Sequence, residues 1–494
     1  MPLPPRLLAT RATVSSLLLL VASIHASAEY EYAISQNLGC KDPTLGDKIE
    51  NIDLETCQSL CTATGDCNFI TFNTRRRNCF LKATCGDAQP NNDDVIGRKV
   101  AGGVPPDSEA SARCSVRDVA WRAHTIDNRW KGADGARTAD VNGDGRPDIV
   151  VGWEQSGRVT MYLSPDYLPR DIGQAPDVED AVFVDLDGDG VVDVVSASEG
   201  STRSLNVHWA PAPSGDYTVA SKWDDARLLD GSNGMREKWM YSLPFDVDGD
   251  GNVDLVVGGK DSGIWWLKAP ESLSRRRDPG GWEQHEISPV GWLMNLFTED
   301  IDGDGHLDLV VADRKGDMAG VRWLKHPGGD GTSRWRNYYM KDGISAMFMS
   351  DLVDVDGDGT RELVVPTENK RIYVLRPSDN VHDQWRDSQI THPRSSKSSG
   401  RRSKAIAVAD IDGEGPLDLV ASFEKAGNGA SGILWSPDFG ETWRDVSGPP
   451  GIKFDLNQLV DMDGDGDLDI LNTEEGGSGQ RDALGVVWYE NPCR

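Results

Sequence analysis

The chain has 494 residues and a formal net charge of −29 at pH 7, because 80 aspartate and glutamate residues outnumber 51 lysine and arginine residues. Phosphate backbones would repel so acidic a chain, which argues against nucleic acid as a partner. The length allows more than one domain.

The first 28 residues have the features of a secretory signal peptide. Arg6 and Arg11 give a positive start, a short apolar stretch runs from Val14 to Ile24, and Ala26-Ser27-Ala28 is typical of a cleavage site. The apolar stretch is too short to span a membrane, and no later segment approaches the length required. We therefore expect a secreted, extracellular protein without a membrane span.

Residues 29–100 form a small cysteine-rich unit, in which Cys40, Cys57, Cys61, Cys67, Cys79 and Cys85 occur. In an oxidising compartment such cysteines are expected to form disulfides. A zinc site is the alternative, but the paired CxxC spacing of such sites is absent from this unit. DLETCQSLCTA predicts a short helix, and CNFITFN and NCFL predict two strands.

This order of a helix bearing two cysteines, a C-x-F-x-x-F strand and a C-x-L strand resembles the PAN/apple family. The resemblance implies the pairings Cys57–Cys79, Cys61–Cys67 and Cys40–Cys85. The segment that follows, residues 101–113, is rich in glycine, proline and serine and is interpreted as a linker. Residues 114–494 then form a second domain.

One acidic phrase occurs seven times in the second domain, for example as DVDGDGNVD. The copies begin 45 to 61 residues apart, at Asp140, Asp185, Asp246, Asp300, Asp354, Asp410 and Asp461. A repeat of this length is typical of one supersecondary unit.

Each copy carries side-chain oxygens at positions 1, 3, 5 and 9, glycine at positions 4 and 6, and a backbone carbonyl available at position 7. Ca²⁺ prefers six to eight oxygen ligands, and glycine lets the backbone bend around the ion. The flanking runs read as strands rather than helices, which excludes an EF-hand. Asp and Gly also form ordinary turns, but seven copies that keep four oxygen positions favour calcium loops.

The phrase thus predicts up to seven Ca²⁺ ions. Asn142, Glu362 and Glu414 replace aspartate but retain an oxygen, and we expect loops one and six to bind most weakly. The predicted ligand positions are Asp140, Asn142, Asp144, Arg146, Asp148; Asp185, Asp187, Asp189, Val191, Asp193; Asp246, Asp248, Asp250, Asn252, Asp254; Asp300, Asp302, Asp304, His306, Asp308; Asp354, Asp356, Asp358, Thr360, Glu362; Asp410, Asp412, Glu414, Pro416, Asp418; and Asp461, Asp463, Asp465, Asp467, Asp469.

Two further strand phrases recur beside the loops: IWWLKAP and its relatives end a third strand, and WEQHEI and its relatives begin a fourth. Four strands in each of seven repeats predict a mainly β chain with a seven-bladed β-propeller. WRAHTI from Trp121 is a fourth-strand phrase that precedes the first loop, so the N-terminal strand should complete the last blade. Cys114 and Cys493 flank that closure, and we expect a Cys114–Cys493 disulfide there.

The seven repeats resemble the FG-GAP/VCBS repeat family, propellers with calcium between the first and second strands, as in integrin α-subunits. The resemblance implies the fold and the metal but leaves the function open, because this scaffold serves adhesion modules, lectins and enzymes alike.

The loops at the end of the ring opposite the calcium loops carry charged and aromatic side chains that suit a charged or polyhydroxylated ligand. The candidate ligand residues are Asp134, Arg137, Trp153, Lys238, Trp239, Trp292, Asn295, Arg314 and Lys404. These residues could equally be solvated loop residues, and Trp239 and Trp292 could instead fill the channel. The basic segment THPRSSKSSGRRSK, residues 391–404, could bind an acidic polysaccharide or be a solvated loop.

The leading hypothesis is a secreted, non-catalytic recognition or adhesion module for carbohydrate or extracellular protein ligands. The alternative is a polysaccharide lyase or a sugar dehydratase or isomerase acting on the face away from calcium. Such an enzyme would use Tyr241 as a base, with His392, Lys238 or Arg137 nearby. A purely structural spacer made rigid by calcium remains a third interpretation.

Overall fold

The computed structural model describes residues 30–40, 48–50, 57, 69–73, 76, 78–82 and 88–101 of the N-terminal part and residues 120–211, 219–229, 237–369, 371–390, 402–426, 430–476 and 483–492 of the C-terminal part. Contacts divide the chain into two compact units, residues 1–108 and 109–494. The predicted signal peptide and most of the predicted linker lie outside the described residues, as does at least one cysteine of the predicted pairs Cys40–Cys85, Cys61–Cys67 and Cys114–Cys493.

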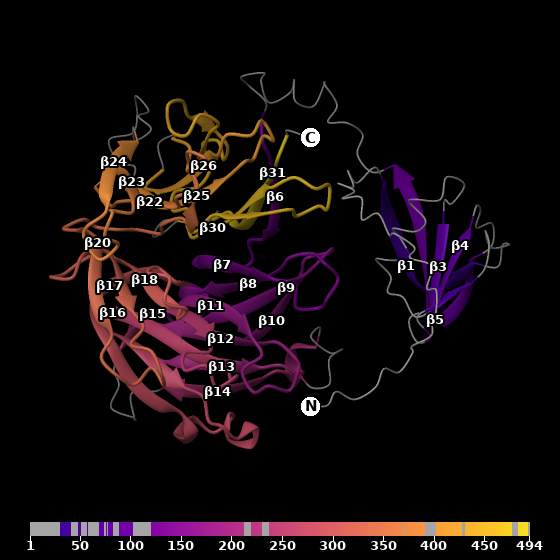
Figure 1. Cartoon of the computed structure of the whole chain (residues 1–494), viewed down its shortest axis with the longest axis horizontal. Coiled ribbons are helices and arrows are strands. Elements are labelled where there is room, and N and C mark those ends of the chain that lie inside the picture. Colours follow the sequence, from indigo (N-terminus) through magenta and orange to yellow (C-terminus); the bar gives the residue numbers. More distant parts are fainter. Residues whose placement is uncertain are drawn as a thin grey trace, which may run out of the picture. The chain divides into compact units, whose positions relative to one another are not determined.

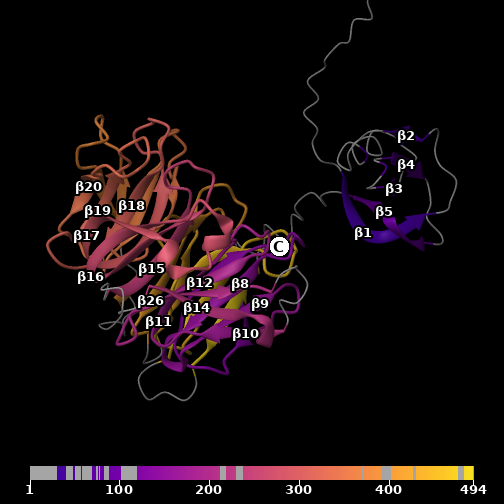
Figure 2. The ribbon, with the colours of Figure 1, turned by 90° about the horizontal axis from the view of Figure 1, so that it is seen from below.

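The N-terminal unit contains one antiparallel sheet with the strand order β1-β5-β3-β4-β2 (Figures 1 and 2). Its strands are β1 (Tyr30–Cys40), β2 (Ile49–Glu50), β3 (Phe69–Asn73), β4 (Asn78–Lys82) and β5 (Ala88–Ala101). The strands β3 and β4 lie where the sequence predicts them. A disulfide joins Cys57, which is helical, to Cys79 on β4, the pairing that the family resemblance implies.

The C-terminal unit consists of strands joined by loops and short 3₁₀ turns (Figure 1). The strands are β6 (Arg122–Asp127), β7 (Ala133–Ala139), β8 (Asp148–Trp153), β9 (Arg158–Leu163), β10 (Leu168–Gln174), β11 (Val178–Val184), β12 (Asp193–Ser198), β13 (Leu205–Trp209), β14 (Asp224–Leu229), β15 (Lys238–Phe245), β16 (Asp254–Lys268), β17 (Glu283–Glu299), β18 (Asp308–Asp313), β19 (Gly320–Lys325), β20 (Arg336–Asp342), β21 (Leu352–Val353), β22 (Glu362–Pro366), β23 (Ile372–Arg376), β24 (Arg386–Ile390), β25 (Arg402–Ala409), β26 (Asp418–Glu424), β27 (Ile433–Ser436), β28 (Arg444–Asp445), β29 (Gln458–Val460), β30 (Asp469–Glu474) and β31 (Gly485–Glu490). The turns are η1 (Glu154–Ser156), η2 (Ala220–Lys222), η4 (Leu273–Arg275) and η5 (Pro279–Gly281). Among the described residues, no helix is long and apolar enough to cross a membrane.

These strands form six sheets, five of four strands and one of six strands, β15 to β20. In the six-stranded sheet, β16 pairs with β15 through residues 254–260 and with β17 through residues 260–268. The first part of β17 pairs with β16, and its second part, residues 293–299, pairs with β18. Because β16 and β17 each comprise two strands, this sheet comprises two blades, and the β-propeller has seven.

We number the blades in chain order. Blades 1 and 2 are β7–β10 and β11–β14, and blades 3 and 4 share the six-stranded sheet. Blades 5 and 6 are β21–β24 and β25–β28. Blade 7 contains β29, β30, β31 and β6.

The N-terminal strand β6 closes the ring, as the sequence predicts. It pairs antiparallel with β31 from Val486↔Asp127 to Glu490↔Arg122, and so supplies the outermost strand of blade 7. Figure 1 shows the two strands next to each other although they come from opposite ends of the propeller sequence.

The hydrophobic core lies between the blades. Seven clusters of buried apolar side chains each join two neighbouring blades, and the seventh joins blade 7 to blade 1. The recurring tryptophans of the third and fourth strands belong to these clusters; Trp209, Trp266 and Trp323 are examples. Burial of this apolar surface is the driving force that holds adjacent blades together.

We predict that Trp121→Ala weakens the ring closure. Trp121, directly before β6, is buried between blades 6 and 7, with its ring centroid 5.9 Å from that of Trp435. The substitution should lower the free energy of unfolding by about 3–5 kcal/mol, measured by urea denaturation. The neighbouring exposed change Arg122→Ala should cost about 0.5 kcal/mol or less. Equal effects of the two changes would contradict the packing role of Trp121.

Candidate functional site

The seven acidic loops occupy the same place in every blade. Each loop connects the first strand of a blade to the second, and its ninth residue is the first residue of that second strand. The loops therefore lie at one end of the propeller, where the sequence predicts calcium.

Backbone hydrogen bonds to the first carboxylate fix the shape of the loop. In loop three, Gly249 and Asp250 donate their N–H groups to Asp246 Oδ1 at 2.8 and 3.2 Å, and Gly251 donates to Asp246 Oδ2 at 2.8 Å. The same pattern recurs in whole or in part in loops one, two, four, five and seven. The two glycines of every loop have φ between +70° and +103°, a conformation that residues with a Cβ rarely adopt.

The third and fifth carboxylates each use one oxygen within the loop. Asp248 Oδ1 accepts from the N–H of Asp250 at 3.3 Å, and Asp250 Oδ1 accepts from Asn252 at 2.8 Å. One oxygen each of Asp246, Asp248 and Asp250 lies within 4.8 Å of the others. Comparable groups form in loop two (Asp185, Asp187 and Asp193) and loop four (Asp300, Asp302 and Asp304). A set of oxygen donors so close together suits a hard cation such as Ca²⁺.

The ninth carboxylate is buried and links the loop to the end of the third strand. Asp254 accepts one hydrogen bond from the N–H of Val247 at 3.1 Å and another from Ala269 at 2.7 Å. Loops one, two, four and seven repeat both bonds, and loops five and six keep the first. Loop six departs further, because within the described hydrogen bonds none reaches the Asp410 carboxylate.

Basic side chains that the sequence analysis did not single out contact four of the loops. Lys268, Lys325 and Arg376, each the last residue of a third strand, form ion pairs with the third and fifth carboxylates of loops three, four and five. Arg277 does the same in loop two. The recurring basic residue before the A-P, H-P or P of the third-strand phrase was a signal that could have revealed Lys268, Lys325 and Arg376, but not Arg277.

Charged residues surround the opposite end of the channel, which we call the mouth. Two equivalent positions in each blade reach this end. The residues six positions after the ninth loop residue are, in chain order, Glu154, Glu199, Lys260, Arg314, Glu368, Glu424 and Glu475. The residues six positions before the first loop residue are Asp134, Glu179, Met240, Met294, Phe348, Lys404 and Asp455. Shifts of strand register occur at this level in blades 1, 2, 3, 4 and 6, and such bulges commonly redirect side chains at the rims of β-structures.

Most of the predicted ligand residues lie at the mouth, where Asp134, Asn295, Arg314 and Lys404 are buried, but two tryptophans point away from the mouth. Trp153 and Trp239 are fully buried in the clusters that join blades 7 and 1 and blades 2 and 3. They immediately flank polar loop residues in sequence, yet their side chains pack between blades, so both are removed from the candidate ligand face. Lys404 pairs with Asp455 at 2.9 Å, and Lys238 is 3.7 Å from Asp261.

Three basic side chains contact the ring of Trp292. The ring centroid is 3.7 Å from Lys260 Nζ, 4.4 Å from Arg314 Cζ and 4.3 Å from Lys315 Nζ. Lys260 and Arg314 also pair with Glu199 and Glu368, whereas Lys315 is exposed. The arrangement gathers positive charge at an aromatic surface, which suits an anionic ligand group.

The channel contains a cavity of about 570 Å³ lined by the first strands of all seven blades. Arg137 and Tyr241 lie there together, with the guanidinium carbon 4.0 Å from the ring centroid, and Arg137 pairs with Asp180 at 3.1 Å. Burial raises the pKa of Tyr241, so its hydroxyl keeps its proton and is poorly suited to act as the base of a lyase. Asn295 also lines the cavity, while His392 lies outside the described residues.

The ninth carboxylates predict a pH dependence for protein freed of divalent cations. Burial raises their pKa above the usual value of about 3.9, so the folded chain binds these protons more tightly than the unfolded chain. Their contribution to stability is present at low pH and is lost as the pH rises through the folded pKa. The pKa is about 7 for Asp193, Asp418 and Asp469 and about 6 for Asp254 and Asp308.

The melting temperature of the cation-free protein should therefore fall between about pH 5 and about pH 8, measured by circular dichroism. Asp254→Asn removes one titrating group and should make this decline shallower. A melting temperature that rises over the same range would show that other groups dominate.

Comparisons with known proteins agree with this architecture. A family model of the FG-GAP-like repeat matches residues 140–196, 246–311 and 300–365, and a model of the PAN domain matches residues 32–97. The chain matches no curated protein.

Several solved structures resemble the chain at low identity. Crystal structures of BBS1N in complex with ARL6DN, soaked with lead or with mercury, have 11% and 12% identity and TM-scores of 0.46 and 0.44; the matches cover 76% of this chain and 98% and 97% of those chains. YCF48 from Cyanidioschyzon merolae has 13% identity and a TM-score of 0.45, covering 76% of this chain and 99% of its own. Similarities at this level do not bear on function. With the two family models and the sheets described above, the chain contains FG-GAP-like repeats, folded as a β-propeller, and an N-terminal PAN domain.

Proposed function

We propose that the chain is a secreted, calcium-binding recognition protein that holds a carbohydrate or an extracellular protein at the mouth of its propeller without catalysing a reaction. FG-GAP-like repeats and a PAN domain in one chain suggest a recognition or adhesion module. Two binding modules on one chain would also raise avidity for a ligand that both can reach.

The observation that carries the proposal is the cluster at Trp292. It offers a half-buried aromatic ring and an exposed ammonium group, Lys315, beside two further cations that pair with Glu199 and Glu368. Aromatic surface with convergent charged groups is typical of sites for sugars that bear carboxylate or sulfate groups. The buried, protonated Tyr241 gives no support to the alternative of a lyase.

Calcium fits the acidic loops because their donors are oxygens and glycine provides the required backbone bends. Bound Ca²⁺ would offset the repulsion among the clustered carboxylates. The residues that would hold it are the side chains at positions 1, 3, 5 and 9 and the carbonyl at position 7. Secretion is supported by the signal-like N-terminus and by the Cys57–Cys79 disulfide, since disulfides persist in oxidising compartments.

Removal of calcium should destabilise the propeller. A ligand that binds the folded state at a hundredfold excess over its Kd stabilises it by about 2.7 kcal/mol per site, so chelation should lower the melting temperature markedly and added Ca²⁺ should restore it. Asp248→Asn should reduce the gain on adding Ca²⁺, whereas the exposed change Asp379→Asn should not. An unchanged melting temperature after chelation would refute calcium binding.

Ligand binding should depend on the Trp292 cluster. On a panel of immobilised glycans, Trp292→Ala should abolish binding, and Lys315→Ala should weaken binding to glycans with carboxylate or sulfate groups while sparing neutral ones. Leu168→Ala, an exposed apolar residue on the outer strand β10, serves as the control. Binding that survives Trp292→Ala would place the ligand elsewhere.

A further inference from the structure

At the mouth, ion pairs or a cation–ring contact between described residues join neighbouring blades at six of the seven joints. Ion pairs join blades 1 and 2 (Arg137–Asp180, 3.1 Å), 2 and 3 (Glu199–Lys260, 3.2 Å), 4 and 5 (Arg314–Glu368, 3.0 Å), 5 and 6 (Glu368–Arg402, 3.3 Å) and 6 and 7 (Lys404–Asp455, 2.9 Å). At the joint of blades 3 and 4, Lys260 lies on the Trp292 ring. Each of these contacts is attractive, and opposite charges meet at five of the seven joints.

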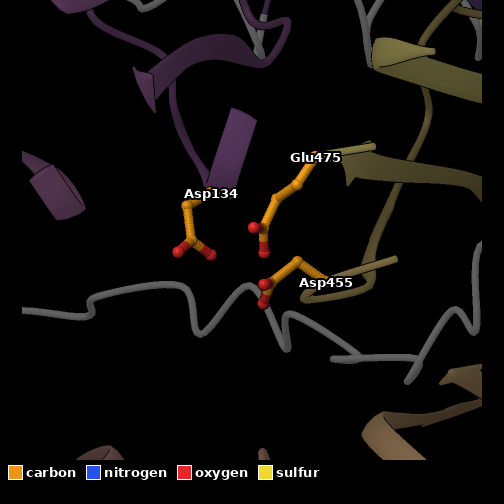
Figure 3. A group of neighbouring side chains, drawn as sticks. All are labelled: Asp134, Asp455 and Glu475. Carbon is orange, nitrogen blue, oxygen red and sulfur yellow. The ribbon is translucent and has the colours of Figure 1, made fainter. Parts of the chain in front are cut away.

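The remaining joint, between blades 7 and 1, brings three carboxylates together instead. Asp134 comes from β7 of blade 1, and Asp455 and Glu475 come from the loops that enter and leave the first two strands of blade 7. One oxygen of each lies within 4.8 Å of the others, and Figure 3 shows the three carboxylates pointing toward one another. All three side chains are buried, with exposed fractions of 5%, 0% and 4%.

Two of these carboxylates have an oxygen without a partner. Lys404 pairs with Asp455 Oδ2 and Lys453 pairs with Glu475 Oε2. Among the described residues, no basic, amide or hydroxyl group donates to the buried Asp455 Oδ1 or Glu475 Oε1, and Asp455 faces the Asp134 carboxyl, which can share a proton with it. An unpartnered buried oxygen is costly, and one on a carboxylate more so. Three carboxylates also exceed the two ammonium groups that touch them.

The backbone holds Asp455 and Glu475 in place. The N–H of Asp455 donates to the carbonyl of Thr473 at 3.1 Å, and the N–H of Glu475 donates to the carbonyl of Lys453 at 3.1 Å. The free oxygens therefore point into the cluster from a fixed frame, as the ligands of a metal site must.

We propose that Asp134, Asp455 and Glu475 bind a hard divalent cation, such as Ca²⁺ or Mn²⁺, that bridges blades 7 and 1. The donors are all carboxylate oxygens, which select such ions over softer metals. The cation supplies the positive charge that basic side chains provide at five other joints.

This site is separate from the acidic loops and is not a product of the repeat. It lies at the opposite ends of the same strands. The positions equivalent to Asp134 in blades 3, 4 and 5 are Met240, Met294 and Phe348, which cannot bind a hard cation through a side-chain oxygen. A second group of carboxylates, Asp134, Glu154 and Glu179, lies at the neighbouring joint of blades 1 and 2, so the acidic donors of the mouth gather in blades 7, 1 and 2. Glu475 belongs to the group at blades 7 and 1 and not to this second group.

Counting bound metal on full-length protein tests the site. Protein stripped of divalent ions is dialysed against Mn²⁺, and the bound metal is measured by elemental analysis. Asp134→Asn should bind one ion fewer per chain than the wild type, and Glu475→Gln should lose the same ion. Asp261→Asn, the same chemical change at an exposed residue near the mouth, should bind as many as the wild type.

A melting experiment on the stripped proteins supplies a readout that does not require metal. Asp134→Asn leaves the two lysine ion pairs intact and removes a buried carboxyl group that faces two others, so it should raise the cation-free melting temperature while reducing the gain on adding Mn²⁺. Equal metal counts in Asp134→Asn and the wild type would overturn the site. If the acidic loops bound no metal, the wild type would still retain one ion and Asp134→Asn none, so the two proposals fail separately.

Discussion

The architecture depends on the buried carboxylate at the ninth position of each acidic loop. Asp254 binds the N–H of Val247 within its loop and that of Ala269 after the third strand. One side chain thus joins the loop, the start of the second strand and the end of the third. A buried carboxylate without these partners would be strongly unfavourable, so the sequence cannot easily vary here. The repetition of this group in seven blades couples the acidic-loop end of the propeller to the packing of every blade.

Much of the fold follows from local sequence, because the same loop and strand phrases recur in the seven repeats. The loop phrase predicts positive φ at two glycines, and the tryptophan phrases predict the third and fourth strands. The closure by β6 follows because WRAHTI precedes the first loop while the last blade lacks a fourth-strand phrase. Among the described cysteines, the Cys57–Cys79 bridge agrees with the family resemblance.

The mouth was less predictable, because its contacts join blades and not neighbours in sequence. Trp153 and Trp239 stand beside polar loop residues, yet each side chain turns into an interface between blades that the local sequence does not specify. Asp134 meets Asp455 and Glu475 across more than three hundred residues, and only the closure of the ring brings them together. In the sequence, Lys268 and Lys325 look like ordinary residues at the end of a strand. Their ion pairs with the acidic loop of the same blade become apparent only in the folded hairpin.

The side chains at the acidic-loop end of the propeller recur from blade to blade, whereas those at the mouth differ among the blades. At the loop end, the same donors recur in every blade, which is the pattern expected of a structural element. At the mouth, blades 6, 7, 1 and 2 present Lys404, Asp455, Asp134 and Glu179 at one level, whereas blades 3, 4 and 5 present Met240, Met294 and Phe348. A symmetric ring with one charged arc and one apolar arc has a defined orientation toward a ligand.

Trp292 and its three cations lie beside the apolar arc, in blades 3 and 4, away from the carboxylates of blades 7 and 1. The exposed ammonium group of Lys315 thus lies apart from the three facing carboxylates, although ion pairs occur between them around the mouth. This difference among the blades favours oriented recognition over a spacer, since a spacer would need none.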